Sequence, residues 1–494
     1  MNIFDYIDHE SSNIALVEGT EELDYKTLYM LVKQRAKYLK FSGAKRVATV
    51  LENGIDWVIF DLACQLAEIC FIPLPHFFSA QQIQHTVSTT GIDTLFVSKD
   101  STCKLGNIES INDFEGLNCI RLAHESVAEL PRSTSKITFT SGSTGTPKGA
   151  CLSFKNQLIV AQSLVGAIDI KQPKHLCILP LSTLLENIAG VYAPLLAGGT
   201  VVLTDSQSLG LHGSSMLNPG QLLSTISAAQ PDSLIIVPEL LMLLTGAVAK
   251  GWKMPESLKF IAVGGSKVSA DLLQRAYDLN LPVYQGYGLS ECASVVCLCT
   301  AEHNRIGSVG QVLDHAHIEI IEGEITINGN NFLGYVGDKS SWYPETVASG
   351  DLAEVDEDGF YTISGRKKNL IISSFGRNIS PEWVESECTQ SGLVQQCVVF
   401  GDAKPWCVAM IALPNPQITE QEVNIWIQQL NESLPDYAQI KNWSILSEKL
   451  SYENGCLTEN GKPKRDVIGK QFQSTLDSLF TAPHASYLKQ EQNQ

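Results

Sequence analysis

Glycines, hydroxyl side chains and one lysine are concentrated in the segment Phe139–Gly149, which reads FTSGSTGTPKG. Three glycines in so short a stretch would let the backbone approach a ligand closely. Backbone amides, hydroxyls and the ammonium group of Lys148 on a single turn suit a polyphosphate ligand. The glycines are Gly142, Gly145 and Gly149, and the hydroxyls belong to Thr140, Ser141, Ser143, Thr144 and Thr146.

Two other interpretations of this segment fit its sequence less well. A Walker phosphate loop requires Ser or Thr directly after its lysine, whereas Lys148 is followed by Gly149. A flexible linker has a similar composition. A linker would not need Pro147 before the lysine, nor lie between a predicted strand (Lys136–Thr140) and a helix predicted from about Ser153. Taken alone, the loop favours phosphate binding only slightly over a linker.

Strand-like apolar runs alternate with segments of helical periodicity over most of the chain. Lys155–Ile168 and Asn218–Ala229 are two of the predicted helices. Such alternation is typical of α/β units with largely parallel sheets. The strand-like runs behind this prediction are Val47–Leu51, Thr94–Val97, Lys136–Thr140, Thr200–Leu203, Ser233–Val237, Phe260–Val263 and Pro282–Gln285.

The pattern changes twice toward the C-terminus. Short runs separated by turn residues predict a small β-rich portion over residues 307–366. Beyond it, Ser380 precedes a proline as a helix N-cap does, and Thr419–Glu422 forms a capping-box sequence. We therefore expect a large N-terminal α/β domain over residues 1–366, followed by a small, mobile α+β C-terminal domain over residues 367–494.

The composition excludes several classes of protein. Hydrophobic residues make up 44% of the chain and charged residues 18%, as in soluble globular proteins. The net charge of −18 argues against a nucleic-acid partner and means that an anionic ligand needs a local cationic or amide-rich site. The 13 cysteines include no Cys-x-x-Cys pair, which favours buried, reduced thiols and a cytoplasmic location.

Membrane insertion is also not expected. The N-terminus MNIFDYIDHE lacks the apolar core of a signal peptide. Polar residues interrupt the apolar stretch Val58–Phe78, and a Pro-Glu pair breaks Leu234–Ala249. These observations predict no transmembrane segment and leave peripheral contact with a membrane open.

The segment Phe139–Gly149 resembles the signature loop of the adenylate-forming superfamily, which includes acyl-CoA synthetases, adenylation domains of peptide synthetases, and luciferases. Further segments resemble the other motifs of that superfamily and follow in the same order. Agreement over residues 139 to 465 is far more specific than one loop. The further segments are Leu179–Glu186, Tyr287–Glu291 (YGLSE), Gly323–Tyr335, Ser349–Asp351, Gly365–Lys368 and Asn460–Lys462.

The resemblance implies an ATP site. Thr140, Ser141, Gly142, Ser143, Thr144 and Gly145 would hold the β- and γ-phosphates together with Lys148. Tyr287, followed by Gly288 and Ser290 in its motif, would stack on adenine. Gly264, Gly265, Ser266, Gln285 and Gly286 would lie along the adenine edge. Asp351 would accept hydrogen bonds from both ribose hydroxyls, with Arg366 beside it.

The resemblance also implies roles in the chemical steps. Glu291 would help to hold Mg²⁺, for which a carboxylate is a suitable hard ligand. Lys462 would bridge the attacking carboxylate and the α-phosphate of ATP. Lys368 would lie at the hinge of the C-terminal domain, and Gly376 would lie where the acceptor thiol passes; an ordinary tight turn explains Gly376 equally well.

The substrate and the acceptor remain open at this level. Thr183 stands where many acyl-CoA synthetases carry a histidine or aromatic residue, but the apolar residues around it favour an aliphatic or aromatic acid, and a fatty acid in particular. Coenzyme A is the expected acceptor, and the phosphopantetheine of an acyl carrier protein is the alternative. A catalytically silent binding protein is the third reading, against which the retention of Lys148, Glu291, Asp351, Arg366 and Lys462 argues.

Overall fold

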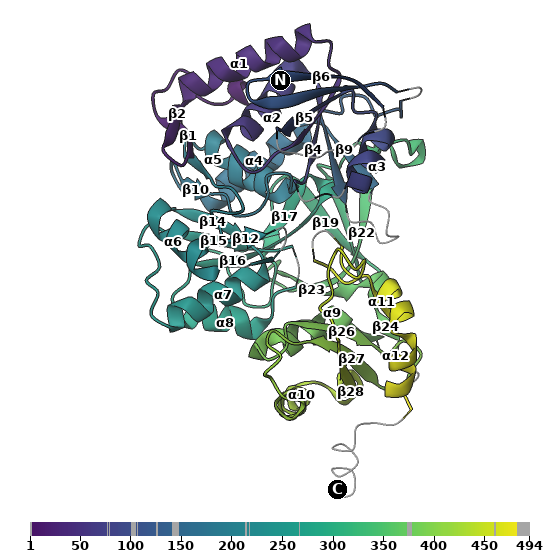
Figure 1. Ribbon diagram of the computed structural model, residues 1–494. Coiled ribbons are helices and arrows are strands. Elements are labelled where there is room, and N and C mark those ends of the chain that lie inside the picture. Colours follow the sequence, from purple (N-terminus) through teal and green to yellow (C-terminus); the bar gives the residue numbers. More distant parts are fainter. Residues whose placement is uncertain are drawn as a thin grey trace, which may run out of the picture.

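Two large β-sheets and the helices packed on them form the upper part of the molecule in Figure 1, and a smaller unit follows at the C-terminus. The computed structural model has the α/β fold that the alternating pattern predicts. It describes residues 2–76, 78, 80–99, 105, 107–124, 127–140, 148–212, 215–216, 218–265, 267–372, 378–458 and 461–481.

The first large sheet has eight strands in the order β21-β9-β8-β4-β3-β5-β7-β6. Strands β8, β4, β3 and β5 run parallel, and the outer strands pair antiparallel. The parallel strands are rich in buried Val, Ile and Ala because both faces of the sheet are covered. The strands are β3 (Arg46–Val50), β4 (Cys70–Leu74), β5 (Thr94–Ser98), β6 (Ile108–Phe114), β7 (Leu117–Leu122), β8 (Lys136–Thr140), β9 (Lys148–Leu152) and β21 (Gly334–Tyr335).

The second large sheet has nine strands in the order β18-β17-β16-β15-β14-β10-β11-β1-β2. Its central six strands are parallel, from β16 to β1. The strands are β1 (Ile14–Glu18), β2 (Glu21–Asp24), β10 (Lys174–Leu176), β11 (Thr200–Leu203), β14 (Ser233–Ile236), β15 (Phe260–Val263), β16 (Val283–Leu289), β17 (Ser294–Leu298) and β18 (Gln311–Val312).

Helices fill the space between the two sheets and cover their outer faces. Helices α1, α2, α4 and α5 share one apolar core with strands of both sheets. Helices α6 to α8 cover the other face of the nine-stranded sheet, and α3 covers the eight-stranded sheet. The helices are α1 (Tyr25–Phe41), α2 (Ile55–Ala67), α3 (Ala80–Thr90), α4 (Phe154–Ile168), α5 (Ala193–Leu196), α6 (Pro219–Ala229), α7 (Pro238–Ala249) and α8 (Ala270–Asp278).

A four-stranded antiparallel sheet follows in the order β19-β20-β22-β23, within the region expected to be rich in β-structure. Its strands are β19 (Ala316–Ile321), β20 (Glu324–Gly329), β22 (Thr346–Val355) and β23 (Tyr361–Arg366). A register shift interrupts the pairing of β22 with both neighbours near Asp351. Such bulges change the direction of nearby side chains, and the side chain concerned here is the carboxylate of Asp351.

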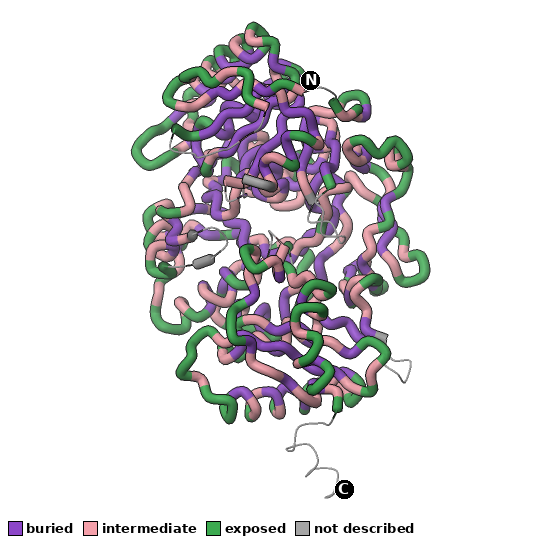
Figure 2. Tube along the Cα trace, turned by 45° about the vertical axis from the view of Figure 1, so that its right-hand side comes forward, coloured by how far each residue is buried: buried purple, intermediate pink, exposed green. Residues whose placement is uncertain are grey.

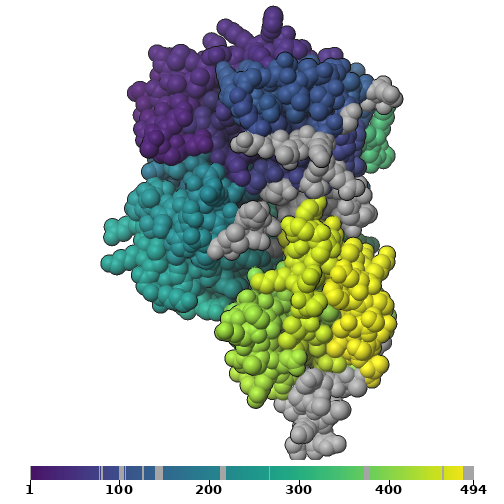
Figure 3. Space-filling model, in the orientation of Figure 1, coloured from purple at the N-terminus to yellow at the C-terminus, as the bar shows by residue number. Residues whose placement is uncertain are grey.

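The C-terminal unit has its own apolar cores around the three-stranded sheet β26-β27-β28. The predicted caps are confirmed, because Ser380 caps α9 and Thr419 with Glu422 forms a capping box on α10. Figure 3 shows this unit packed against the large part of the molecule. Its elements are β24 (Ile371–Ile372), β25 (Asn378–Ile379), α9 (Pro381–Cys388), β26 (Gln396–Phe400), β27 (Cys407–Ala412), α10 (Glu420–Ser433), β28 (Ile440–Ile445), α11 (Arg465–Gln471) and α12 (Gln473–Leu479).

The glycine-rich segment differs from its expected setting in one respect. We expected a loop between a strand and a helix, whereas Lys148 and Gly149 begin a second strand, β9, that pairs antiparallel with β8. The predicted helix does follow, since Ser153 caps α4. Hairpin pairing of Thr140 with Lys148 fixes both ends of the segment, which a strand–helix connection would not do.

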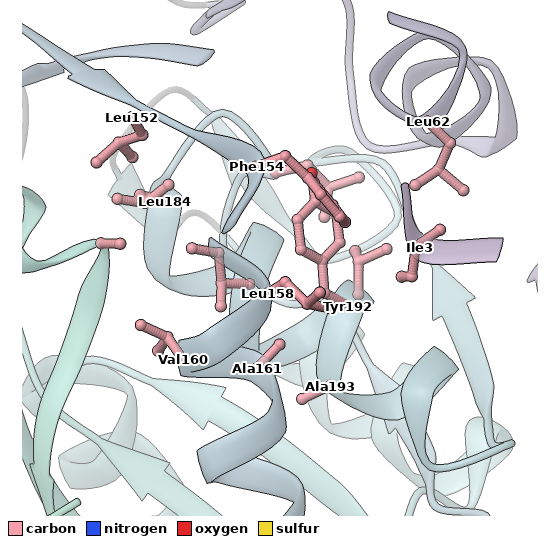
Figure 4. Close-up of a cluster of buried hydrophobic side chains, with 14 of the residues drawn as sticks. Ile3, Leu62, Leu152, Phe154, Leu158, Val160, Ala161, Leu184, Tyr192 and Ala193 are labelled. Atoms are coloured by element: carbon pink, nitrogen blue, oxygen red, sulfur yellow. The ribbon is translucent and has the colours of Figure 1, made fainter. Parts of the chain in front are cut away.

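A buried polar cluster anchors β8 to the helices between the sheets. Lys136 Nζ lies 2.9 Å from Asp61 Oδ1, and Tyr192 Oη donates to Asp61 Oδ2 at 2.8 Å. Lys136 also donates to Asn187 and to Tyr192 Oη, and both charged side chains are at most 2% exposed. Figure 4 shows Tyr192 beside the apolar side chains of Phe154 and Leu158, and Figure 2 shows that buried residues predominate inside the upper part of the molecule.

A π-helical turn carries two members of this cluster. Residues Glu186–Tyr192 (η2) continue into α5, and all but Ala189 are buried. The twelve cysteines that the structure describes are likewise buried thiols, as the sequence indicates. Within the described residues, no helix is both long and apolar enough to cross a membrane.

The buried pair yields a stability prediction. Lys136→Met leaves the Asp61 carboxylate uncompensated in an apolar setting, and we expect the free energy of unfolding to fall by about 3–5 kcal/mol. Removing both charges in Lys136→Met/Asp61→Asn should recover part of that loss. Urea unfolding followed by fluorescence measures both; equal destabilisation of the single and double variants would contradict this account of the pair.

Candidate active site

The carboxylate of Asp351 is the centre of the largest polar cluster built from the predicted site residues. The register of β22 and β23 places Asp351 directly opposite Arg366. Arg366 Nε lies 2.7 Å from Asp351 Oδ1, and the aspartate side chain is only 7% exposed. Gly350 has φ of +74°, a conformation that glycine adopts without strain, and Ser349 Oγ accepts a hydrogen bond from the Asp351 amide. The bulge thus directs the carboxylate at its partners.

Tyr287 comes from the nine-stranded sheet and completes the cluster. It lies in β16, and its hydroxyl donates to Asp351 Oδ2 at 2.8 Å. Burial, and then the negative charge of Asp351, raises the pKa of this hydroxyl, which therefore remains a proton donor at neutral pH. One carboxylate consequently joins the large sheet to the four-stranded sheet.

Lys462 reaches the same cluster from the C-terminal unit. Its backbone exchanges hydrogen bonds with Thr458, whose amide donates to the Lys462 carbonyl at 2.7 Å. Desolvation by burial, and then the positive charge of Arg366, lowers the pKa of Lys462. The negative charge of Asp351 opposes that shift. Lys462 as a whole is exposed to solvent, and the desolvation that lowers its pKa acts on the ammonium group. Two cations thus face one carboxylate.

A third cation, Lys368, lies beside the same residues at the start of the C-terminal unit. Partial burial and then the charge of Arg366 lower the pKa of Lys368. Glu382 raises this pKa again, and the same glutamate pairs with Arg465 at 3.4 Å. The predicted hinge lysine therefore belongs electrostatically to the cluster around Asp351.

A second polar cluster forms around Glu291. Tyr335 Oη donates to Glu291 Oε1 at 2.7 Å, and Lys148 Nζ lies 5.0 Å from the centre of the Tyr335 ring. Pairing of β21 with β9 holds Tyr335 beside the start of β9, where Lys148 lies. Burial, and then Glu291, raises the pKa of the Tyr335 hydroxyl. Glu291 follows Tyr287 by four residues, so one short segment contributes to both clusters.

Several glycines predicted to bind the nucleotide are in restricted backbone positions. A Cβ atom at Gly288 would lie 1.9 Å from the Ser294 carbonyl oxygen, and one at Gly264 would lie 3.2 Å from the Gly286 oxygen. Gly265 has φ of +85°. Gln285 is buried in β16, and its Oε1 has no hydrogen-bond partner within the described residues.

Several predicted residues cannot be placed. The phosphate-loop residues Ser141, Gly142, Ser143, Thr144 and Gly145 lie outside the described residues, as do Ser266 and Gly376. The backbone of Thr140 ends β8, and Ser290 begins the short 3₁₀ turn that carries Glu291.

Four neighbours of the site were not singled out from the sequence. Tyr335 was noted only as part of a motif, yet it bonds Glu291. Arg465 pairs with Glu382 and Glu385, and burial raises the pKa of Glu385 to about 7 although Arg465 lowers it. The basic run Lys462–Arg465 was the available signal for Arg465, whereas no sequence pattern identified its glutamate partners.

The apolar stretch near Thr183 is largely part of the core. Leu184 and Ile188 are buried, and Glu186 is fully buried with its Oε1 3.1 Å from His175 Nε2. Thr183 and Leu185 keep intermediate exposure. Only part of the stretch is therefore available to line a substrate pocket.

Comparison with known families agrees with this arrangement. The sequence model of the family described as AMP-binding enzyme matches residues 5–335, more than half of the chain. The model described as AMP-binding enzyme C-terminal domain matches residues 368–484.

Two curated relatives illustrate the range of similar proteins. A 2-succinylbenzoate–CoA ligase of Staphylococcus epidermidis is 26% identical, over 92% of this chain and 94% of its own length. A long-chain-fatty-acid–CoA ligase of Mycobacterium bovis is 24% identical, over 90% of this chain and 89% of its own length.

Solved structures agree with the fold. The crystal structure of an anthranilate CoA ligase with anthranoyl-AMP superposes with a TM-score of 0.79 at 17% identity, covering 95% of this chain and 97% of that one. The O-succinylbenzoate coenzyme A synthetase of Bacillus subtilis with ATP and magnesium gives 0.74 at 23% identity, covering 92% and 96%. Together with the matching family models and the ordered motifs, these findings show that the chain belongs to the AMP-binding enzyme family, the adenylate-forming enzymes that its motifs resemble.

Proposed function

We propose that this protein is an AMP-forming acid–CoA ligase that uses ATP to activate an apolar carboxylic acid. The observation that carries the proposal is the buried Asp351 carboxylate held between Tyr287 and Arg366, with Lys462 beside it. A buried carboxylate with two oxygens can accept both hydroxyls of a ribose. The names of the curated relatives support the same reaction class.

In the first half-reaction, a carboxylate oxygen of the acid attacks the α-phosphorus of ATP. A new oxygen–phosphorus bond forms, the bond to the bridging oxygen breaks, and pyrophosphate leaves. Tyr287 would stack on the adenine, while Asp351 would fix the ribose and Arg366 would hold that carboxylate in position. The resulting acyl-AMP is a mixed anhydride with a reactive acyl carbon.

The residues around Glu291 fit a magnesium ion. A carboxylate oxygen is a hard ligand, and Tyr335 engages only Oε1, which leaves Oε2 for a metal. Bound Mg²⁺ would neutralise phosphate charge during displacement. Lys148, whose Nζ lies over the Tyr335 ring, would hold the departing phosphates with the preceding loop.

Lys462 would neutralise charge where two anions approach one another. The attacking carboxylate and the α-phosphate repel each other, and one cation between them lowers that cost. One charge pair at about 4 Å is worth about 4 kcal/mol at an effective dielectric near 20. The cationic neighbours Arg366 and Lys368 add positive charge at this point of a chain with net charge −18.

In the second half-reaction, the thiol of coenzyme A attacks the acyl carbon, the bond to AMP breaks, and a thioester forms while the thiol proton is released. The C-terminal domain, residues 367–494, would rotate about Lys368 relative to residues 1–366 to replace Lys462 with the thiol path near Gly376. The C-terminal unit has separate apolar cores, which is compatible with movement as a body.

The acid is proposed to be a fatty acid or a similar apolar monocarboxylic acid. The only charged side chain between Pro180 and Gly190 is Glu186, and this residue is buried against His175. That stretch would thus offer no cation to the second carboxylate of a substrate such as succinylbenzoate. The curated fatty-acid ligase relative supports this choice.

Two alternatives remain testable. A carrier-protein phosphopantetheine in place of coenzyme A would use the same first half-reaction and differ only in the acceptor. A silent binding protein would keep the fold without the chemistry. The joint placement of Tyr287, Asp351, Arg366 and Lys462 favours an enzyme over a silent protein.

The proposal predicts acid-dependent release of pyrophosphate from ATP. Across a panel of fatty, aryl and dicarboxylic acids, we expect release with apolar monocarboxylic acids and thioester formation once coenzyme A is added. Pyrophosphate and thioester are measured separately, with carrier protein as the alternative acceptor. Absence of release with every acid would favour the silent protein.

Lys462→Ala should separate the two half-reactions. Adenylation should slow by about 100- to 1,000-fold, the usual cost of losing a preorganised donor. Thioester formation from preformed acyl-AMP should change little. Lys470→Ala on α11 removes another exposed lysine of the same unit and is the matched control. An equal fall in both half-reactions, with folding intact by circular dichroism, would show that Lys462 has a different role.

A further inference from the structure

The solvent-facing side of helix α1 has an unusual composition. Its exposed side chains recur at spacings of three and four residues, so they occupy one arc of about 100° around the helix. The arc contains four lysines and two large apolar residues, and the opposite side of the helix packs into the main core. These exposed residues, called here the basic face, are Lys26, Met30, Lys33, Lys37, Lys40 and Phe41.

The surrounding sequence is depleted of acidic residues. No Asp or Glu occurs between Tyr25 and Leu51, although the whole chain contains 53 acidic and only 35 basic residues. The same stretch contains seven Lys and Arg residues, including exposed Lys45 just after the helix. Positive charge is therefore concentrated on one helix of an acidic protein.

Neighbouring elements neutralise only part of this charge. Glu10 pairs with Lys26 at 3.6 Å, and Asp56 and Glu115 pair with Arg35, which is buried beneath the basic face. In the part of the chain that the structure describes, Lys33, Lys37 and Lys40 form no ion pair with an acidic side chain. The C-terminal half of the basic face therefore keeps its positive charge.

Two apolar side chains project from the same face. Phe41 is 94% exposed and Met30 is 55% exposed. Transfer of a large, almost fully exposed aromatic side chain from water into an apolar phase lowers the free energy. Lysines beside an exposed aromatic residue form the pattern of helices that lie on anionic lipid surfaces, where the lysines contact headgroups. An acidic protein would complement the lysines but give no reason for Phe41.

We propose that the basic face of α1 docks the protein on the surface of a membrane that contains anionic lipids. Lys33, Lys37 and Lys40 contact the headgroups, and Phe41 inserts at the boundary with the acyl chains. Figures 1 and 3 show α1 at the end of the molecule opposite the C-terminal unit. Docking there leaves the C-terminal unit clear of the membrane, and it requires no part of the proposed catalytic machinery.

Vesicle co-sedimentation of the full chain tests this inference. We expect binding to vesicles of phosphatidylglycerol mixed with phosphatidylcholine, little binding to phosphatidylcholine alone, and loss of binding at about 1 M salt, where screening is nearly complete. Lys33→Glu/Lys37→Glu/Lys40→Glu should weaken binding on the order of 100-fold, since each lysine near the surface is worth about fivefold. Phe41→Ser should weaken binding at every salt concentration at which the unmodified chain binds.

The matched control is Lys171→Glu/Lys250→Glu/Lys253→Glu, which changes the net charge equally at exposed lysines elsewhere. It should bind vesicles almost as well as the unmodified chain. If both triple variants lost vesicle binding equally, the binding would depend only on the net charge of the protein, and the proposal would be overturned. Binding to polyglutamate without binding to anionic vesicles would assign the face to an acidic protein and would also overturn it. The readout is independent of ligase activity, so it remains informative if the proposed reaction is wrong.

Discussion

The carboxylate of Asp351, almost fully removed from water, imposes the main constraint on the site. A buried charge is stable only where partners satisfy its oxygens. Here the partners are Tyr287 from the nine-stranded sheet and Arg366 from the opposing strand β23. The carboxylate thus fixes the position of the four-stranded sheet against the large domain and, in our account, presents two oxygens to a ribose.

The cations around this carboxylate explain how an acidic protein can accept a polyanion. Arg366, Lys368 and Lys462 come from the end of β23 and from the C-terminal unit, and burial, followed by repulsion from Arg366, lowers the pKa of the two lysines. An incoming phosphate would relieve that repulsion. The same charges favour a position of the C-terminal unit near the site, because the negative charge of Asp351 acts on both Lys462 and Lys368.

The sequence was a good guide where local signals agree with the fold. Apolar runs located seven of the ten parallel strands of the two large sheets, and cap residues at Ser153, Ser380 and Thr419 marked helix starts. The resemblance to the adenylate-forming superfamily implied that Tyr287, Asp351 and Arg366 share a site, and the structure brings both Tyr287 and Arg366 within hydrogen-bond distance of Asp351. Their roles toward a nucleotide remain predictions.

Long-range pairing explains what the sequence did not predict. The hairpin of β8 and β9 is extended by β21, which pairs with β9. Strand β21 lies almost 200 residues later in the chain and contains Tyr335, which donates a hydrogen bond to Glu291. Glu186, which the sequence analysis placed only at the end of a motif, is buried at the start of the π-helical turn and pairs with His175 in β10. Neither contact leaves a local pattern in the sequence.

Nucleotide discrimination by Asp351 tests the central claim most directly. Calorimetric titration would compare AMP with 2′-deoxy-AMP and 3′-deoxy-AMP, on the unmodified protein and on Asp351→Asn. If Asp351 accepts both ribose hydroxyls, the unmodified protein binds AMP more tightly than either deoxy analogue, and Asp351→Asn loses most of that preference. Equal affinities of the unmodified protein for all three nucleotides would contradict the account.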